Sequence, residues 1–109
     1  MARLIKQSDP SAATLTTIYT VPGNVFVRIE WIMIANRSIA TSYRLAISPD
    51  GAAIANGHYI AYDVAISTSA AALIEGPFYL QQTDIIRVYA TLATLSFGVY
   101  GIESMRGFF

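Results

Sequence analysis

The longest apolar-rich run in the chain is residues 24–36, which read NVFVRIEWIMIAN. A period of two that persists over this length, with many β-branched residues, is typical of a strand. One alternating set is wholly apolar and contains the only tryptophan: Val25, Val27, Ile29, Trp31, Met33 and Ala35. We therefore predict a core strand here, with Trp31 and Met33 facing the interior.

The other set in this run is polar in the middle and apolar toward its end. Arg28 and Glu30 give way to Ile32 and Ile34, and Phe26 precedes them. The charged part of such a face can be exposed to solvent, whereas the apolar part is expected to be buried against another element or a partner. We expect Phe26, Ile32 and Ile34 to contact something beyond this strand.

Shorter alternating segments recur along the rest of the chain. Strands are predicted at residues 15–19, 43–48, 58–66, 85–91 and 94–103, and one that bends or breaks at Gly76-Pro77 is predicted across residues 70–80. Val21-Pro22-Gly23-Asn24 predicts a type II turn with a positive φ at the glycine. Gly98 and Gly101 predict a bulge or a close backbone approach in the last strand.

The spacing of these segments favours one fold class. Seven to nine short strands, with turn signals between them and no ten-residue helical period, predict an all-β, antiparallel two-sheet β-sandwich. A jelly-roll-like arrangement is favoured over an immunoglobulin-like one, and the sequence does not give the strand order. We predict a single domain over residues 1–109, with an N-terminal arm (about 1–8) and an apolar C-terminal tail (about 104–109); residues 2–6 also suit a short strand.

Composition adds a preference for association. The chain is 54% hydrophobic and 13% charged, and its seven basic residues balance seven acidic ones. This balance disfavours nucleic acid and membrane surfaces as partners. Low charge favours association, although a monomer covered by Ala, Ser and Thr is the alternative. The start of the chain has no apolar signal segment and no apolar run is long enough to span a membrane, so we expect neither export nor insertion.

No residue pattern predicts catalysis, a cofactor or a metal. His58 is the only histidine, the chain has no cysteine, and no G-x-S-x-G motif supports a triad with Asp63 or Asp84. Asp50 and Asp84 flank turns, where carboxylates accept backbone N–H bonds; a loop calcium site with Asp50 is the alternative, but the spacing does not match a calcium-binding loop. We expect a protein that is not an enzyme.

Several segments together resemble a known family. They are Ile18–Gly23, Ile34–Asn36, Tyr43–Ile47, His58–Asp63, Asp84–Ala90 and Leu95–Gly101. In combination they resemble small β-sandwich structural proteins of tailed bacteriophages, over about residues 15–103. The final MRGFF has no counterpart in that pattern.

The resemblance implies a virion protein assembled in the host cytoplasm, either a capsid decoration (cement) protein or a tail or baseplate subunit. Its partners would be further copies, as a trimer or dimer, and the major capsid or tail proteins. Candidate interface residues are Leu4, Ile5, Phe26, Ile32, Ile34, Met105, Arg106, Phe108 and Phe109. The alternative function is a receptor- or glycan-binding module of a tail fibre, using the loops at residues 36–41 and 50–58.

Overall fold

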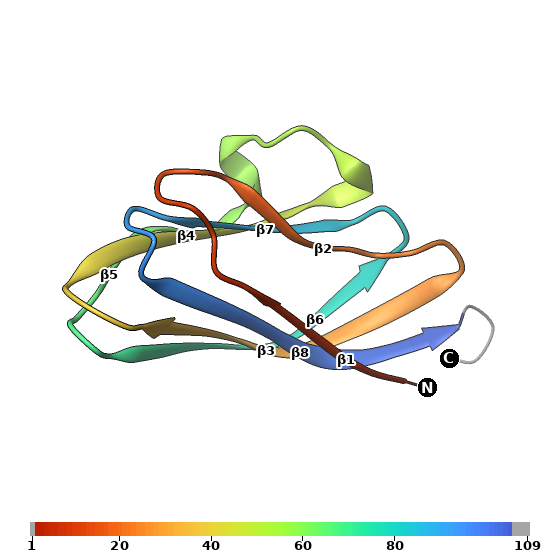
Figure 1. Ribbon diagram of the computed structural model, residues 1–109. Helices are drawn as coiled ribbons and strands as arrows, with labels where there is room; N and C mark the ends of the chain where they lie inside the picture. The colour runs from red at the N-terminus through yellow and green to blue at the C-terminus, as the bar shows by residue number, and fades with distance from the viewer. Residues whose placement is uncertain (1, 106–109) are drawn as a thin grey trace.

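The chain forms two antiparallel four-stranded sheets packed face to face (Figure 1). The structure, a computed structural model, describes residues 2–105. Its strands are β1 (Ala2–Ser8), β2 (Thr16–Thr20), β3 (Val25–Asn36), β4 (Thr41–Ser48), β5 (Tyr59–Ile66), β6 (Ala71–Gln81), β7 (Ile85–Ala90) and β8 (Leu95–Met105), with 3-10 turns η1 (Pro49–Gly51) and η2 (Asn56–His58). The predicted all-β sandwich is confirmed.

Strand order identifies the sandwich as a jelly roll. Sheet A has the order β1-β8-β3-β6 and sheet B the order β2-β7-β4-β5. Consecutive strands therefore alternate between the sheets, except for the β4–β5 hairpin within sheet B. This is the order of two interlocked Greek keys in an eight-stranded jelly roll, so the immunoglobulin-like alternative is wrong.

The core lies between the sheets and is almost entirely aliphatic. Sheet B contributes Leu45, Ile86 and Val88. The ring of Tyr43 meets the edge of Phe97 from sheet A, with centroids 6.4 Å apart. The largest buried side chains of sheet A are Val27, Ile29, Ile32, Ile34, Leu95, Phe97 and Val99.

A β-bulge in the middle of β3 reverses the alternation of its side chains. The register of β3 shifts between Ile29 and Trp31 against both neighbours: Glu30 is an extra residue relative to β8, whereas β6 has one residue more than β3 across the same interval, at Gly76-Pro77. Because successive side chains point to opposite faces, one extra residue exchanges the faces beyond it. Ile32 is consequently buried, whereas Trp31 is 42% exposed and Met33 is 40% exposed. The prediction that Trp31 and Met33 face the interior is wrong.

Glycines on both neighbouring strands make room for the bulge. A Cβ atom at Gly76 on β6 would overlap the carbonyl oxygen of Ile29, and one at Gly101 on β8 would overlap that of Arg28. The close backbone approach predicted at Gly101 is confirmed. Pro77 follows Gly76 on β6, which is an edge strand, as its missing N–H requires.

The N-terminal residues belong to the sandwich. Residues 2–8 form β1 and pair along their whole length with β8. The expectation of an N-terminal arm at about residues 1–8 is therefore wrong. Ser104 and Met105 end β8, so the predicted tail begins after them, in residues outside the described part of the chain.

The turn before β3 differs from the predicted type II turn. The positive φ belongs to Asn24, at 60°, and Gly23 has none. Asparagine tolerates the left-handed region better than other non-glycine residues. The Asn24 N–H also donates to the side-chain carbonyl of Gln82, at 3.2 Å, which ties this turn to the β6–β7 turn.

Candidate interaction surface

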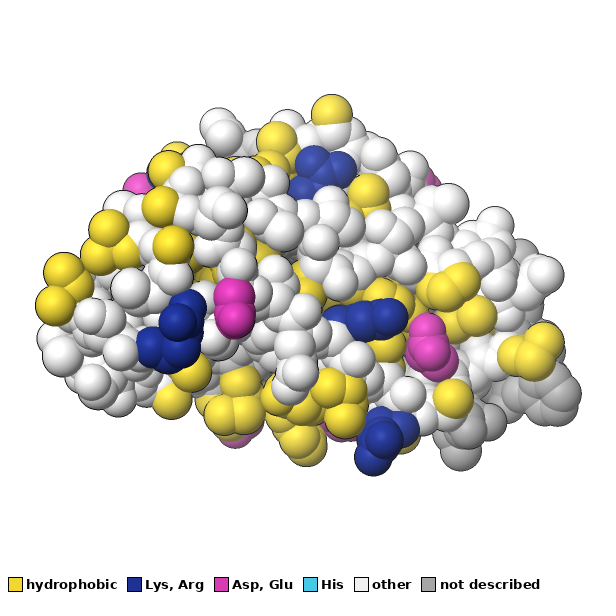
Figure 2. Space-filling model, in the orientation of Figure 1, with side chains coloured by type: hydrophobic (Ala, Val, Ile, Leu, Met, Phe, Trp, Pro, Cys, Tyr) yellow, Lys and Arg dark blue, Asp and Glu magenta, His cyan; other side chains and the backbone are white. Residues whose placement is uncertain are grey.

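The face of sheet A that points away from the core is rich in large apolar side chains; we call it the sheet A surface. Figure 2 shows apolar side chains gathered along the lower margin of the molecule, beneath sheet A. Its exposed large apolar residues are Ile5, Trp31, Met33, Leu73 and Tyr79, and half-buried Tyr100 and Ile102 lie among them. Such a face differs from the polar outer face expected of an antiparallel sheet in water.

Strand pairing makes these side chains one continuous band. Tyr100 on β8 pairs with Ile5 on one side and with Trp31 on the other. The rings of Trp31 and Tyr100 have centroids 6.0 Å apart and are tilted by 33°. In the next row, Met33 pairs with Leu73 on β6. The band therefore crosses sheet A from β1 to β6.

Two hollows lie on this surface, on either side of Tyr100. The larger, of about 450 Å³, lies beside the ring of Tyr100 and is lined by Gln7, Ser8, Asp9, Met33, Ala35, Ser96, Phe97, Gly98 and Tyr100. The smaller, of about 190 Å³, is lined by Arg3, Leu4, Ile5, Glu30, Trp31, Tyr100 and Gly101. A Cβ atom at Gly98 would meet the ring of Tyr100, so the glycine allows that ring to lie flat over β8.

Few charges interrupt the band. Arg28 and Glu30 form an ion pair with Nε and Oε1 2.5 Å apart, and both side chains are substantially exposed. Such a pair contributes little to stability. Arg3 on β1 and Glu75 on β6 lie on opposite edge strands, and neither forms an ion pair with another described residue. Arg3 and Glu75 are thus unpaired charges of opposite sign near opposite edges of the sheet A surface, and Asp9, which lines the larger hollow, also forms no ion pair with a described residue.

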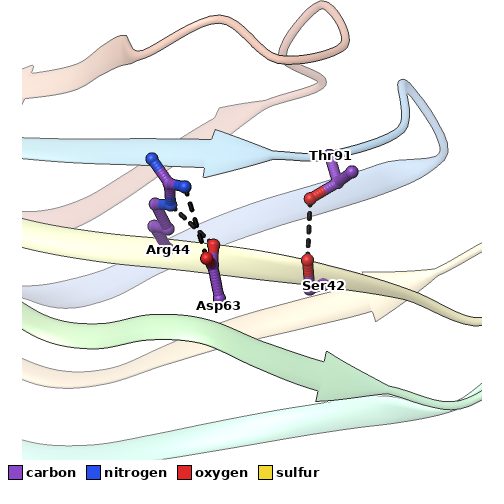
Figure 3. A network of polar contacts seen from close by, with 4 residues as sticks. All are labelled: Ser42, Arg44, Asp63 and Thr91. Atoms are coloured by element: carbon purple, nitrogen blue, oxygen red, sulfur yellow. Dashed lines mark hydrogen bonds and ion pairs between the residues drawn. The ribbon is translucent and has the colours of Figure 1, made fainter.

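The outer face of sheet B has its own internal contacts (Figure 3). Arg44 donates from Nε to Asp63 Oδ1 at 2.6 Å and from Nη2 to Oδ2 at 3.3 Å. Its guanidinium lies 4.2 Å from the ring centroid of Tyr62 and 4.4 Å from that of Tyr89. The hydrogen bond to Asp63 raises the pKa of Arg44 above its usual value. This cluster links β5, β4 and β7.

The Arg44 cluster leaves few charged or hydrogen-bonding groups free to bind a ligand. The guanidinium has a carboxylate and two aromatic faces, which are its best partners. In the same region Ser42 and Thr91 share a hydrogen bond of 2.7 Å between their hydroxyl groups. We therefore interpret the outer face of sheet B as a solvated face stabilised within the chain.

A partly buried hydrogen bond between side chains joins the two sheets. The Tyr19 hydroxyl on β2 donates to Glu103 Oε2 on β8, at 2.5 Å. Burial, and then the hydrogen bond and negative charge of Glu103, raise the pKa of Tyr19 well above its ordinary value. The bond joins β2 of sheet B to β8 of sheet A.

The residues considered for a triad serve local structure. His58 Nδ1 accepts the Ala55 N–H at 3.1 Å and lies 3.3 Å from Ser48 Oγ. The Asp84 carboxylate accepts backbone N–H bonds from Asp50 at 2.9 Å and Gln81 at 3.0 Å, which confirms the predicted turn role of Asp84. Residues 2–105 contain no group of three or more His, Asp or Glu side chains placed to hold a metal ion.

The two loops proposed for glycan binding do not form one site. Residues 36–41 precede β4 and residues 50–58 follow it, so the loops lie at opposite ends of that strand. Asn36, in the first loop, is buried, and its Nδ2 donates to the carbonyl oxygens of Ile39 at 2.8 Å and Ser67 at 2.9 Å. That amide therefore organises the loop.

The predicted interface residues divide into three groups. Leu4, Ile32 and Ile34 are buried in the core, so the expectation that they face a partner is wrong. Ile5 and Met105 are exposed, and Phe26 is half-buried. Arg106, Phe108 and Phe109 lie outside the described residues.

Sequence reasoning missed most of the sheet A surface, including Trp31, Met33 and Leu73. A signal was present in β3: one alternating set carries Arg28 and Glu30 and then Ile32 and Ile34. A set that changes from charged to apolar within one strand indicates a change of face, and hence a bulge.

No family model, curated protein or solved structure matches this chain. Nor do residues 2–105 include a helix long and apolar enough to cross a membrane. The surfaces described above and the motifs in the sequence are therefore the basis for a functional proposal.

Proposed function

We propose that this protein is a non-enzymatic structural subunit of a tailed-bacteriophage virion, a capsid decoration (cement) or tail or baseplate protein. In this role it stabilises the particle through contacts between subunits. The sheet A surface is the observation that carries the proposal, because it is a broad apolar face on which the described residues form no cluster of polar groups suited to a small ligand.

Burial of this face supplies the free energy for assembly. Soluble monomers rarely expose a contiguous apolar patch larger than a few hundred Å². Each 100 Å² of apolar surface removed from water contributes about 2.5 kcal/mol before the costs of association. A subunit with such a face is more stable against a neighbour than in water.

Two of the four sheet edges, β5 and β6, favour association through a face over the addition of a strand. Edge strands that are regular invite pairing with another chain. β5 contains Asp63 with a φ of 50° and shifts register twice against β4, and β6 contains Pro77, which has no N–H to donate. The outer edges of these two strands are poor templates for a further strand.

Support for the virion comes from the sequence and from the type of fold. The segments that resemble tailed-phage structural proteins lie in six of the eight strands, all except β1 and β6. Jelly rolls serve in viral capsids and also in lectins, so the fold is compatible with both the main proposal and its alternative. Extents of 45 × 26 × 19 Å suit a compact plug on a shell better than a shaft.

The alternative, a receptor- or glycan-binding module of a tail fibre, has weaker support. Its two loops lie at opposite ends of β4, and Arg44, the cation best placed to meet an anionic sugar beside an exposed aromatic ring, is already paired with Asp63. Saturable binding of the purified chain to host cells or to a glycan array would favour this alternative.

Particles made with and without the chain test the proposal. Virions are purified from the genome that encodes it and from the same genome with the gene interrupted. We expect the chain at a fixed copy number in the first, and lower resistance to heat in the second, restored when the purified chain is added back. Absence of the chain from purified virions would refute the virion role.

A further inference from the structure

We infer that two copies of this chain pack their sheet A surfaces together about a two-fold axis that runs parallel to the strands, between β8 and β3. The occupant of the sheet A surface is thus a second copy of the same surface. This inference deepens the association part of the proposed function and does not depend on the virion.

The order of the strands determines which side chains meet. Sheet A has β8 and β3 at its centre and β1 and β6 at its edges. Rotation about the stated axis places β8 over β3 of the second copy and β1 over its β6. Gly98 pairs with Met33 within one chain, so the rotation places Met33 of each copy over Gly98 of the other.

The surface complements itself in shape at that point. The larger hollow borders Gly98, next to the ring of Tyr100 that lies over this glycine, and Met33 lines the same hollow. A methionine is unbranched and flexible, so it fills an irregular hollow well. The same rotation stacks Tyr100 of each copy against Trp31 of the other, in the middle of the band.

The charges complement each other as well. Arg3 lies on β1 and Glu75 on β6, one row apart along the strands. Rotation about the stated axis brings β1 over β6, so each Arg3 approaches Glu75 of the other copy. An axis running across the strands through the row of Trp31 would instead bring the two Glu75 side chains together, and like charges oppose association.

The size of the surface suits a stable dimer. Sheet A has four strands and its long strand β8 has eleven residues. At about 4.8 Å between strands and 3.4 Å per residue, the face measures roughly 19 by 35 Å. Two such faces bury about 1,300 Å² in total, within the range of about 1,200–2,000 Å² typical of specific interfaces.

The main test compares matched lysine substitutions on the two outer faces. Met33→Lys lies on the sheet A surface and Ile60→Lys on the outer face of sheet B; the original side chains are 40% and 44% exposed. Sedimentation equilibrium reports the mass. We expect the wild type and Ile60→Lys to reach twice the chain mass of 11.8 kDa. Met33→Lys remains monomeric, because an unpaired buried charge raises Kd by about tenfold or more.

Trp31 supplies an independent signal, because it is the only tryptophan and lies in the proposed interface. On dilution of the wild type, its emission shifts to longer wavelength as the mass falls, whereas Met33→Lys has the long-wavelength emission at every concentration. Unchanged far-ultraviolet circular dichroism shows that both variants fold. A monomeric wild type at high concentration, or dissociation caused by Ile60→Lys alone, would overturn the inference.

The chain has no cysteine, so single cysteines can report the direction of the axis. Packed sheets lie about 10 Å apart, too far for a direct disulfide, and a short bis-maleimide is therefore used. Gln7 and Leu73 occupy opposite edge strands in the same row. We expect cross-links when Gln7→Cys and Leu73→Cys are mixed, and none in either alone; efficient cross-linking of each variant with itself would overturn the stated axis.

The two proposals fail separately. A dimer that is absent from virions would refute the virion role and leave the interface intact. A chain present in virions whose incorporation and solution mass are insensitive to Met33→Lys would overturn the sheet A interface and leave the virion role intact.

Discussion

Truncation of two adjacent residues in β3 tests the bulge directly. Ile34 is fully buried and Met33 is 40% exposed, although regular alternation from Val27 and Ile29 would place Met33 inside and Ile34 outside. The bulged strand predicts that Ile34→Ala is strongly destabilising and that Met33→Ala has a small effect. A regular strand predicts the reverse order.

The expected magnitude for Ile34 follows from its burial. The substitution removes three carbon atoms from a site with no exposure, each worth about 0.8 kcal/mol of transfer free energy. A cavity between two packed sheets adds to this loss, because the β-sheets relax only partly around it. We expect Ile34→Ala to lower the free energy of unfolding by about 3–4 kcal/mol and Met33→Ala by less than about 1 kcal/mol.

Urea denaturation monitored by far-ultraviolet circular dichroism measures both values. Association stabilises the folded chain by mass action, so all samples are compared at one low concentration at which sedimentation shows monomers. The slope of unfolding free energy with urea should be equal among the variants, which indicates an unchanged unfolded state. A loss from Met33→Ala equal to or larger than that from Ile34→Ala would refute the bulge.

Three further changes test other parts of the structure by the same unfolding measurement. Gly101→Ala should lower the free energy of unfolding by about 2–3 kcal/mol, because the added methyl group meets the backbone of β3. Its control, Gly23→Ala, has no atom within 4 Å of the added carbon and should lower it by less than about 0.5 kcal/mol. Equal losses would contradict the close approach at Gly101. Tyr19→Phe removes a hydrogen bond to Glu103 and should cost about 1.5–3 kcal/mol at neutral pH. Because the pKa of Tyr19 is raised in the folded state, the folded chain keeps a proton that the unfolded chain loses above pH 10. The free energy of unfolding of the wild type therefore falls as the pH rises past that value, and in Tyr19→Phe this fall should be shallower. An identical pH profile for the two proteins would contradict the assignment. Asp84→Ala leaves the backbone N–H groups of Asp50 and Gln81 without their acceptor and should lower the free energy of unfolding by about 2–4 kcal/mol. A urea midpoint close to that of the wild type would contradict this expectation.

Much of the fold was predictable because its signals are local. Alternation located the strands to within a few residues, and the irregularity predicted at Gly76-Pro77 coincides with the register shift between β3 and β6. Strand order was not predictable, since it depends on which β-strands pair across long distances in the chain. The same limit applies to β1. Most side chains of residues 2–8 are exposed, so only the pairing of these residues with β8 distinguishes a strand from an arm.

The interaction surface was predictable only in part, because one residue changes the meaning of the pattern. Val27 and Ile29 were assigned correctly to the core, and counting by two from them assigned Trp31 and Met33 there as well. The extra residue Glu30 reverses every later position. Arguments from side-chain size favour the same error, since a tryptophan is a plausible core residue until its strand register is known.

The bulge therefore links the fold to the proposed interface. In a regular β3, Trp31 and Met33 would fill the core, and Ile32 and Ile34 would give the outer face a smaller aliphatic surface. With Glu30 inserted, the compact isoleucines pack between the sheets, and the larger side chains join Tyr100 and Leu73 outside. The glycines of β6 and β8 that accommodate the bulge are thus required for the interface as well as for the fold. A substitution at Gly101 that leaves the chain folded but straightens β3 should abolish the dimer, as measured by sedimentation, without replacing any of the large apolar side chains of the sheet A surface.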